Sequence, residues 1–339
     1  MPPSSDYLPE HMLTKRIFLW VALCLGATRL HAVSVYEPFD YPAASDLAGQ
    51  GGWVLTAGTS PKVQNGTLAV PGLMPASAGK SLVFGGGQME VRRFMKSSAG
   101  PGEFNGYYWY SLAFKVTDLG SLTTNGDFIA SFSSTNLTTE YGGRLFLRTD
   151  IGGAPGGYNI GVSRDSSATA DIVWSGNLYH TNDTNFVVCR FATPDQASTD
   201  TLLWINPDPS TYGQASPPAP DLTASGGVNL LTVVGEIVLR LSASQTLGGI
   251  VLDELRVEGQ WASVTPIPLT MSVTLTNSTD VYLSWGGNQN VFLQQATGLS
   301  APITWTSLNS DASIHSWTVT NAVADPVPKF YRLVRWYVQ

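Results

Sequence analysis

The sequence predicts an all-β protein: a jelly-roll sandwich followed by a small C-terminal β-sandwich. Charged residues make up only 13% of the 339 residues, whereas glycine (34) and proline (21) are plentiful. Helix surfaces usually carry Glu and Lys, so this balance favours strands joined by tight turns. Turn pairs such as Asn105-Gly106, Asn125-Gly126 and Gly156-Gly157 separate short apolar runs, and no long amphipathic helix stands out. Many short strands at this spacing indicate a sandwich rather than alternating β and α units.

Residues 1–32 have the order of a secretory signal peptide. Lys15-Arg16 precedes the apolar run Ile17–Ala27, and Ala32 closes the segment with a small residue. The run is too short to cross a bilayer, which takes about 20 apolar residues. A buried N-terminal strand or an uncleaved anchor is the alternative, and the true start could be Met12. We therefore expect a secreted or surface-exposed protein without a membrane span.

Residues 33–264 form the first predicted domain. Its clearest predicted strands are Tyr108–Val116, Asp127–Phe132, Arg144–Arg148, Tyr158–Arg164, Phe186–Phe191, Leu202–Ile205, Ile237–Leu241 and Gly249–Val257. Pro207–Pro220 is expected to be a long surface loop, either disordered or draped over the sandwich. Cys189 is the one cysteine after the predicted signal peptide, and it lies in a predicted strand. We expect a buried thiol and no internal disulfide.

Residues 265–269 are the predicted linker, because Pro266 and Pro268 stiffen the backbone and remove hydrogen-bond donors. Residues 270–339 then resemble a small fibronectin-like sandwich that serves as a spacer or attachment module. Its predicted strands are Met271–Leu275, Val281–Trp285, Val291–Ala296, Ile303–Leu308, Ile314–Val319 and Lys329–Val334. Its expected core anchors are Trp285, Trp305 and Trp317.

The strongest local signal is the segment Val251–Val257. Period-two alternation places Asp253 on the same face as Val251, Leu255 and Val257. A carboxylate on an apolar face needs an ion partner, a hydrogen bond or a cation, because isolated burial costs several kcal/mol. At the other end of the domain, Glu37 shares a strand face with Phe39 and Tyr41.

The opening Tyr36–Tyr41 (YEPFDY) and the closing Leu252–Val257 (LDELRV) resemble the first and last strands of concanavalin A-like lectin/glucanase sandwiches, the laminin-G-like group. The resemblance covers residues 35–264. It implies that the terminal strands lie side by side and that carboxylates there hold a structural Ca²⁺. Glu37 and Asp253 are the implied metal ligands, with Asp40 as a weaker one. Alternatively, backbone amides or Arg256 satisfy Asp253.

Catalytic motifs are missing from the sequence. Some enzymes of the resembled group hydrolyse β-glucans with two glutamates that flank an aspartate on one strand. No Glu-x-Asp-x-Glu occurs here, and Glu90, Glu103, Glu140 and Glu236 stand alone. His180 and His315 follow the predicted signal peptide but lie in different predicted domains, which leaves little material for a zinc site or a catalytic triad. We expect no enzymatic activity, although a divergent enzyme that assembles carboxylates from separate strands is the alternative.

Aromatic and arginine side chains supply the candidate ligand-binding residues. Tyr107 and Trp109 point away from the expected core face of their strand, and Arg144 and Arg148 share one face of theirs. On one open sheet they would form a platform, since aromatic rings stack on sugars and arginines bind hydroxyls or acidic sugars. The alternative is cross-strand packing in which arginine stems cover aromatic rings.

Charge limits the partners. The formal net charge is −7 and no basic stripe occurs, so nucleic acid is not an expected ligand and anionic membranes are disfavoured. The resulting prediction is a non-catalytic binding protein for extracellular carbohydrate. A structural or adhesive module of the cell envelope without a sugar site is the second hypothesis, and a divergent polysaccharide-degrading enzyme is the third.

Overall fold

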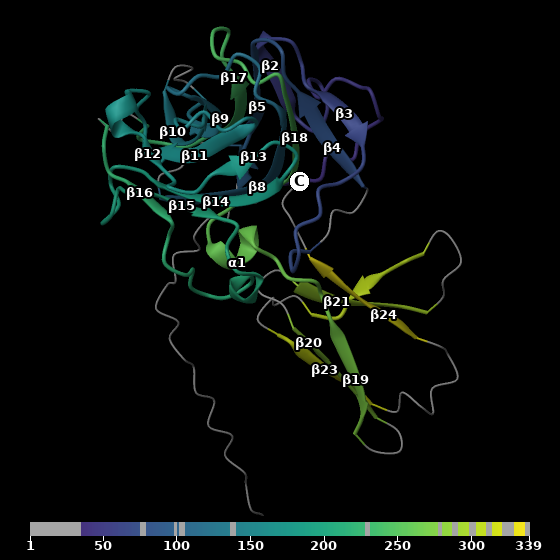
Figure 1. Ribbon diagram of the computed structural model, residues 1–339. Helices are drawn as coiled ribbons and strands as arrows, with labels where there is room; N and C mark the ends of the chain where they lie inside the picture. The colour runs from purple at the N-terminus through teal and green to yellow at the C-terminus, as the bar shows by residue number, and fades with distance from the viewer. Residues whose placement is uncertain are drawn as a thin grey trace, which may run out of the picture. The chain divides into compact units, whose positions relative to one another are not determined.

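The computed structural model describes residues 35–74, 79–97, 100–101, 106–135, 140–227, 231–276, 280–286, 291–297, 303–309, 314–320 and 329–335. Antiparallel strands dominate these residues (Figure 1), so the all-β prediction is confirmed. Their helical elements are short: α1 (Trp261–Val264) and the 3₁₀ turns η1 (Thr169–Asp171) and η2 (Pro209–Thr211). None of the described helices is long and apolar enough to span a bilayer. The predicted signal peptide lies outside the described residues.

Two eight-stranded sheets form the sandwich. Sheet A has the order β16-β15-β14-β8-β18-β4-β3, with β1 paired to β18. Its strands are β1 (Val35–Glu37), β3 (Lys62–Asn65), β4 (Lys80–Phe84), β8 (Tyr107–Asp118), β14 (Thr184–Ala192), β15 (Thr201–Ile205), β16 (Leu222–Ala224) and β18 (Gly249–Glu258). The predicted pairing of the opening and closing segments is confirmed, since Glu37 lies opposite Leu255.

Sheet B has the order β12-β11-β10-β9-β17-β5-β2, with β13 paired to β11. Its strands are β2 (Trp53–Gly58), β5 (Met89–Phe94), β9 (Asp127–Ser133), β10 (Tyr141–Thr149), β11 (Gly157–Ser163), β12 (Val173–Trp174), β13 (Tyr179–His180) and β17 (Glu236–Leu241). A separate small hairpin consists of β6 (Lys96–Ser97) and β7 (Gly100–Pro101).

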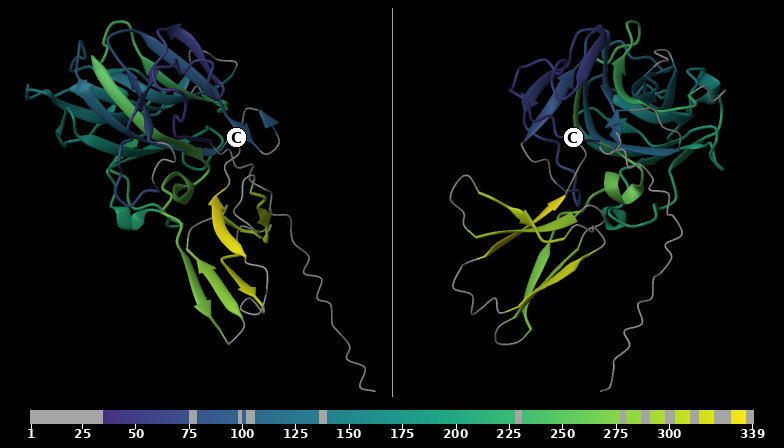
Figure 2. Two further views of the ribbon diagram at one scale, coloured as in Figure 1. Left: turned by 90° about the vertical axis from the view of Figure 1, so that its right-hand side faces the viewer. Right: turned by 180° about the vertical axis from the view of Figure 1, so that it is seen from behind.

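The sheets face each other across one apolar core (Figure 2). Alternate residues of β8 point into it, namely Tyr108, Tyr110, Leu112, Phe114 and Val116. Cys189 is also fully buried in this core, and burial raises the pKa of its thiol to about 12. The predicted buried thiol is thereby confirmed.

The outer face of sheet A is covered by three tryptophans and the chain segments that hold them. Trp109 stacks on Trp204 with ring centroids 5.2 Å apart, and Trp261 from α1 packs on both. The Trp204 indole donates to the Pro218 carbonyl at 3.0 Å, and the Trp261 indole donates to the Thr211 carbonyl at 2.9 Å. The loop over residues 207–220 is therefore draped over the sandwich, as one of the two alternatives predicted.

The first residues of the predicted linker pack on the same face. The Thr265 hydroxyl donates to the Trp261 carbonyl at 2.9 Å, and the Met74 amide donates to the Pro266 carbonyl at 2.7 Å. Ile267 is half-buried against the tryptophan cluster. Residues 265–267 are thus held by the sandwich.

The C-terminal strands are β19 (Met271–Leu275), β20 (Val281–Trp285), β21 (Val291–Ala296), β22 (Thr306–Ser307), β23 (Ser316–Val319) and β24 (Phe330–Arg335). They form the sheets β19-β20-β23 and β22-β21-β24. Trp285 is buried in their apolar cluster and Trp317 packs on it. The predicted role of Trp305 is wrong: it is only half-buried, and the Arg332 guanidinium lies 4.2 Å from its ring centroid.

A β-bulge overturns the face predicted for Asp253. In the pairing of β18 with β8, Asp253 lies opposite Ala113 and Arg256 opposite Ser111, so two residues of β18 face one of β8. Glu254 takes a left-handed φ of 56° at this point. Asp253 consequently shares the outer face with Val251, whereas Leu255 and Val257 point into the core.

Candidate functional site

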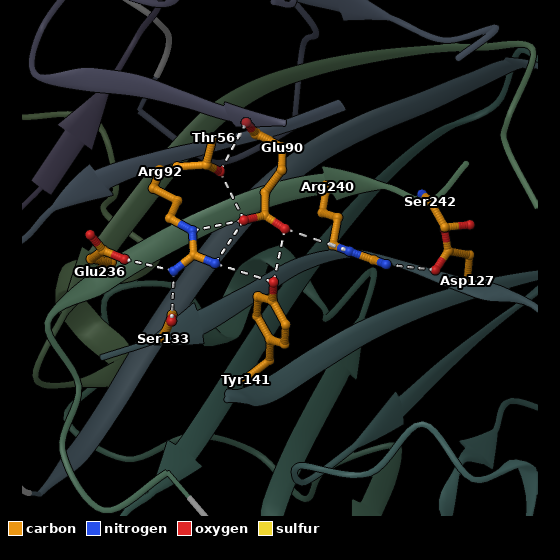
Figure 3. A network of polar contacts seen from close by, with 9 residues as sticks. All are labelled: Thr56, Glu90, Arg92, Asp127, Ser133, Tyr141, Glu236, Arg240 and Ser242. Atoms are coloured by element: carbon orange, nitrogen blue, oxygen red, sulfur yellow. Dashed lines mark hydrogen bonds and ion pairs between the residues drawn. The ribbon is translucent and has the colours of Figure 1, made fainter. Parts of the chain in front are cut away.

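The outer face of sheet B carries a network of charged side chains (Figure 3). On β5 the alternation places Met89 and Val91 in the core and turns Glu90 and Arg92 outward. Register then brings their partners close, because β5 pairs with β17 and β17 pairs with β9. Three strands that are distant in sequence thereby assemble one polar surface.

Arg92 is the centre of this network. Its Nε donates to Glu90 Oε1 at 2.8 Å, and its Nη1 donates to Glu236 Oε2 at 3.1 Å. The same guanidinium also donates to the Ser133 hydroxyl at 3.1 Å and to the Tyr141 hydroxyl at 3.2 Å. The Arg92 side chain is 5% exposed, and one cation therefore compensates two nearly buried carboxylates.

A second arginine extends the network along the same face. Arg240 Nη1 donates to Asp127 Oδ1 at 3.0 Å, and Arg240 Nε lies 3.7 Å from Glu90 Oε2. The other oxygen of Asp127 accepts from the Ser242 amide at 2.7 Å. The Arg240 guanidinium also lies 4.3 Å from the Phe128 ring centroid.

The surroundings of Glu90 and Tyr141 shift the pKa values of these two groups in opposite directions. Burial alone would raise the pKa of Glu90, but hydrogen bonds from Arg92, Tyr141 and Thr56 outweigh it and lower that pKa. Burial, the hydrogen bond to Glu90 and the charge of Glu90 raise the pKa of Tyr141. At neutral pH, Glu90 is therefore an anion and Tyr141 a phenol. Neither group is tuned to exchange a proton at neutral pH.

Two further arginines of β10 stack on aromatic rings beside the network. The Arg144 guanidinium lies 5.2 Å from the Phe128 centroid and 5.5 Å from that of Tyr141. The Arg148 guanidinium lies 4.3 Å from the Trp174 centroid. Such cation–π contacts orient an arginine without neutralising it.

The charges of these two arginines are not compensated by an ion pair in the part of the chain that the structure describes. There, only Nε of each donates a hydrogen bond, from Arg144 to the Tyr141 carbonyl and from Arg148 to Asn159 Oδ1, both at 3.2 Å. Burial lowers the pKa of Arg144 to about 10, which keeps it charged at neutral pH. Arg144 is only 8% exposed, whereas Arg148 is partly exposed, so the Arg148 guanidinium is the more accessible of the two.

The predicted platform of Tyr107, Trp109, Arg144 and Arg148 is not formed. Trp109 and Tyr107 belong to β8 of sheet A, whereas both arginines belong to β10 of sheet B. Trp109 is buried under α1, and the Tyr107 ring packs against the Arg190 guanidinium at 5.0 Å. Alternation showed which way each side chain points on its own strand, but it could not show which sheet holds each strand. The aromatic neighbour of Arg148 is Trp174 instead.

The residues implied as calcium ligands are engaged by protein donors. Glu37 is 1% exposed, and its Oε2 accepts from the Trp53 indole at 2.9 Å, the Tyr41 hydroxyl at 2.9 Å and Arg93 Nη1 at 2.6 Å. Its Oε1 accepts from the Phe39 amide at 2.8 Å. A carboxylate paired with an arginine does not fit a calcium shell.

Asp253 is also satisfied by protein donors, as the alternative to metal binding predicted. Its Oδ2 accepts from the Thr67 hydroxyl at 2.5 Å and the Leu68 amide at 2.8 Å, and its Oδ1 accepts from the Glu254 amide at 2.8 Å. The described residues contain no group of three or more His, Cys, Asp or Glu side chains placed to hold a metal. Calcium binding by Glu37, Asp40 and Asp253 rests on the resemblance alone and stays a prediction.

We expect Asp253 to make the sandwich less stable as the pH rises. Burial raises the pKa of this carboxyl from 3.8 to about 6. Because the folded pKa exceeds the unfolded one, the stabilisation is complete below pH 3.8 and is lost as the pH rises through 6, by about 3 kcal/mol. Urea unfolding at several pH values between 4 and 7 should show a larger loss in the native protein than in Asp253→Asn, which keeps only the smaller contribution of Glu254, whose pKa burial also raises. A stability difference between the two proteins that does not change with pH would contradict the assignment.

Strand β5 was not predicted from the sequence, and neither was the pairing of Glu90 with Arg92. The signal was present in Met89-Glu90-Val91-Arg92, where apolar and charged residues alternate as in a half-buried strand. Glu236 and Tyr141 offered no such signal, because their link to Arg92 depends on the pairing of distant strands.

Comparisons with known proteins give structural likeness only. No family model matches the chain, and no curated protein matches it. Among solved structures, an endo-β-1,4-glucuronan lyase from the fungus Trichoderma reesei is 11% identical, covers 66% of this chain and 97% of its own, and has a TM-score of 0.37. Domain 4 of the extracellular arabinanase AbnA from Geobacillus stearothermophilus, solved with arabinotriose, is 14% identical in sequence and has a TM-score of 0.37. The match covers 68% of this chain and 95% of that domain. An alginate lyase solved with alginate tetrasaccharide is 11% identical in sequence and has a TM-score of 0.38. The match covers 67% of this chain and 96% of the lyase. At these TM-scores the likeness carries no conclusion about function.

Proposed function

We propose that this protein is a secreted carbohydrate-binding protein that holds an acidic polysaccharide on the outer face of sheet B. The observation that carries the proposal is the pair Arg144 and Arg148, whose guanidinium groups stack on aromatic rings without an ion partner among the described residues. A guanidinium fork matches the geometry of a carboxylate and binds it through two parallel hydrogen bonds. Uronic acids present such carboxylates along a sugar chain.

The spacing of the two arginines suits an extended ligand. They are four residues apart on β10, which corresponds to about 13 Å along a strand. Phe146 lies between them on the same face, and Trp174 and Tyr141 lie at either end as half-buried rings. Aromatic faces of this kind stack on the C–H surface of sugar rings. This surface would thus contact several sugar units of one polysaccharide chain.

The outer face of sheet A offers no comparable surface in the described residues. Trp109 and Trp204 are already covered by Trp261 of α1 and by the loop over residues 207–220. Arg190, the arginine of that face beside Tyr107, is directed at the Asp200 carbonyl at 3.5 Å. These contacts support packing there and leave sheet B as the face for a ligand.

Binding without bond cleavage is favoured by the protonation pattern of the network. Hydrolysis by a carboxylate pair needs one acid that stays protonated near neutral pH. The pKa of Glu90 is lowered, and Tyr141 stays a phenol. A divergent polysaccharide-degrading enzyme and an adhesive module without a sugar site are the competing hypotheses.

The test compares two arginines in matched surroundings. Arg148 stacks on Trp174 at 4.3 Å and donates to Asn159, whereas Arg332 stacks on Trp305 at 4.2 Å and donates to Gln294. We expect Arg148→Gln to weaken binding of polygalacturonate or alginate about 10- to 100-fold, because a charge-assisted hydrogen bond is lost. Arg332→Gln should bind like the native protein. Calorimetric titration at two salt concentrations measures both.

Each other outcome favours a competing hypothesis. Equal loss in both variants would indicate a nonspecific charge effect. Absence of binding to acidic and neutral polysaccharides alike would favour the adhesive module. Release of reducing ends from the polysaccharide, abolished by Glu90→Gln, would favour an enzyme.

A further inference from the structure

A cavity of about 420 Å³ lies at the start of the sandwich, away from the arginine pair of β10. This volume falls within the range of ordinary small-molecule sites. It is lined by β1, the turn that follows, the residues before β2 and the end of β5, namely Val35, Tyr36, Glu37, Pro38, Asp40, Tyr41, Gly51, Gly52, Arg93 and Phe94.

The charges of Glu37 and Arg93 in this cavity cancel. Arg93 Nη1 lies 2.6 Å from Glu37 Oε2, and their side chains are only 15% and 2% exposed. The Tyr41 hydroxyl donates to the same oxygen. Gly51 makes that contact possible, because a Cβ at this position would lie 1.8 Å from the Tyr41 hydroxyl oxygen. The floor of the cavity, formed by Glu37, Arg93 and Tyr41, is therefore electrically neutral.

Among the described residues, the rim of this cavity carries polar groups for which no hydrogen bond is found. Asp40 is exposed and forms no hydrogen bond or ion pair with the described part of the chain. The amides of Gly51 and Gly52 likewise donate no hydrogen bond there. Phe94 is 45% exposed, which is unusual for a phenylalanine. A hydrogen-bonding rim beside an exposed ring is a setting for a ligand with one polar edge and one apolar face.

We propose that this cavity is a second ligand site that binds one neutral sugar ring, independently of the arginine pair on sheet B. Phe94 stacks on the C–H face of the ring, Asp40 accepts hydrogen bonds from adjacent hydroxyls, and the Gly51 and Gly52 amides donate to ring or hydroxyl oxygens. Asp40 repels uronates and phosphates, because the other charges of the site are paired. The two sites therefore take sugars of different charge.

The experiment uses saturation-transfer NMR on the full chain with methyl α-glucopyranoside, methyl α-mannopyranoside and methyl β-galactopyranoside as separate probes. We expect at least one to bind with a dissociation constant of about 1 mM, as for a ligand of this size. Asp40→Asn should weaken binding about tenfold, and Phe94→Ala several-fold. Matched controls are Asp46→Asn, which removes an exposed carboxylate paired with Lys62, and Leu55→Ala, which removes an exposed apolar side chain of β2. Both controls should bind like the native protein.

Several results would overturn the second site. These are no saturation transfer to any of the three probes, equal binding by Asp40→Asn and its control, or loss of the signal on addition of EDTA, which would make the contact metal-mediated. The acidic-polysaccharide site on sheet B and the neutral-sugar site at Asp40 can be contradicted independently of each other. Arg148→Gln should leave the methyl glycosides unaffected, and Asp40→Asn should leave the acidic polysaccharide unaffected.

Discussion

Replacing Arg92 with methionine is expected to lower the free energy of unfolding of the sandwich by about 3–5 kcal/mol. Arg92 holds Glu90 and Glu236, whose side chains are 10% and 7% exposed. Methionine keeps much of the volume of the side chain but removes the Arg92 cation from two nearly buried carboxylates, of which Glu90 keeps Arg240 at 3.7 Å. The cost is the desolvation of unpaired charge rather than a cavity, because burial of an uncompensated ion is the dominant penalty when one partner of a buried pair is removed.

Urea unfolding followed by tryptophan fluorescence measures this effect. The control is Lys62→Met, which breaks the exposed pair with Asp46, where both side chains are at least 50% exposed. Exposed pairs contribute about 0–1 kcal/mol, so the control should stay close to the native protein. Adding Glu90→Gln and Glu236→Gln to Arg92→Met should recover part of the loss, since the two negative charges that Arg92 compensated disappear. A loss in Arg92→Met no larger than in the control would mean that the network does not compensate charge as described.

The second large effect is expected from Trp261→Ala, also about 3–5 kcal/mol. Trp261 is 1% exposed and packs on both Trp109 and Trp204, with ring centroids 6.1 and 5.3 Å away. Its removal leaves a cavity over sheet A and takes away the indole donor of the Thr211 carbonyl. The loop over residues 207–220 and the segment 265–267 would lose their common support.

Trp305→Ala is the matched control for this substitution, because Trp305 is half-buried and lies outside the C-terminal apolar cluster. It should change the unfolding free energy much less. Limited proteolysis gives a second measurement, since cleavage within residues 207–220 should accelerate in Trp261→Ala alone. Unchanged cleavage together with unchanged unfolding would contradict the supporting role of α1.

Most long strands were predictable because their pattern is local. Strand β8 alternates apolar residues over its whole length, and the structure places those residues in the core. Strands β2 to β5 were not predicted, and in β5 three charged residues interrupt the apolar run. Pairing of β1 with β18 was implied by the resemblance to a known sandwich group, and the structure bears it out.

Alternation failed at one point of the candidate calcium site because a bulge interrupts it. The extra residue at Glu254 turns Asp253 onto the outer face of sheet A, where Thr67 and two amides satisfy it. A bulge depends on two paired strands, so the sequence of β18 alone does not reveal it. In the same way, Glu90 and Glu236 stand alone in the sequence and meet at Arg92 only after three strands pair.

The sequence by itself determined the all-β class, most of the strands and the direction in which Arg144 and Arg148 point, since these follow from periodicity along a single segment. Only the tertiary structure decided that the two arginines stand with Trp174 rather than Trp109, that Trp109 is covered, and that Asp40 faces an open cavity. The physical reason is that burial and pairing arise between segments far apart in the chain. Strand register and the segments that cover each sheet set them, and a local pattern contains neither.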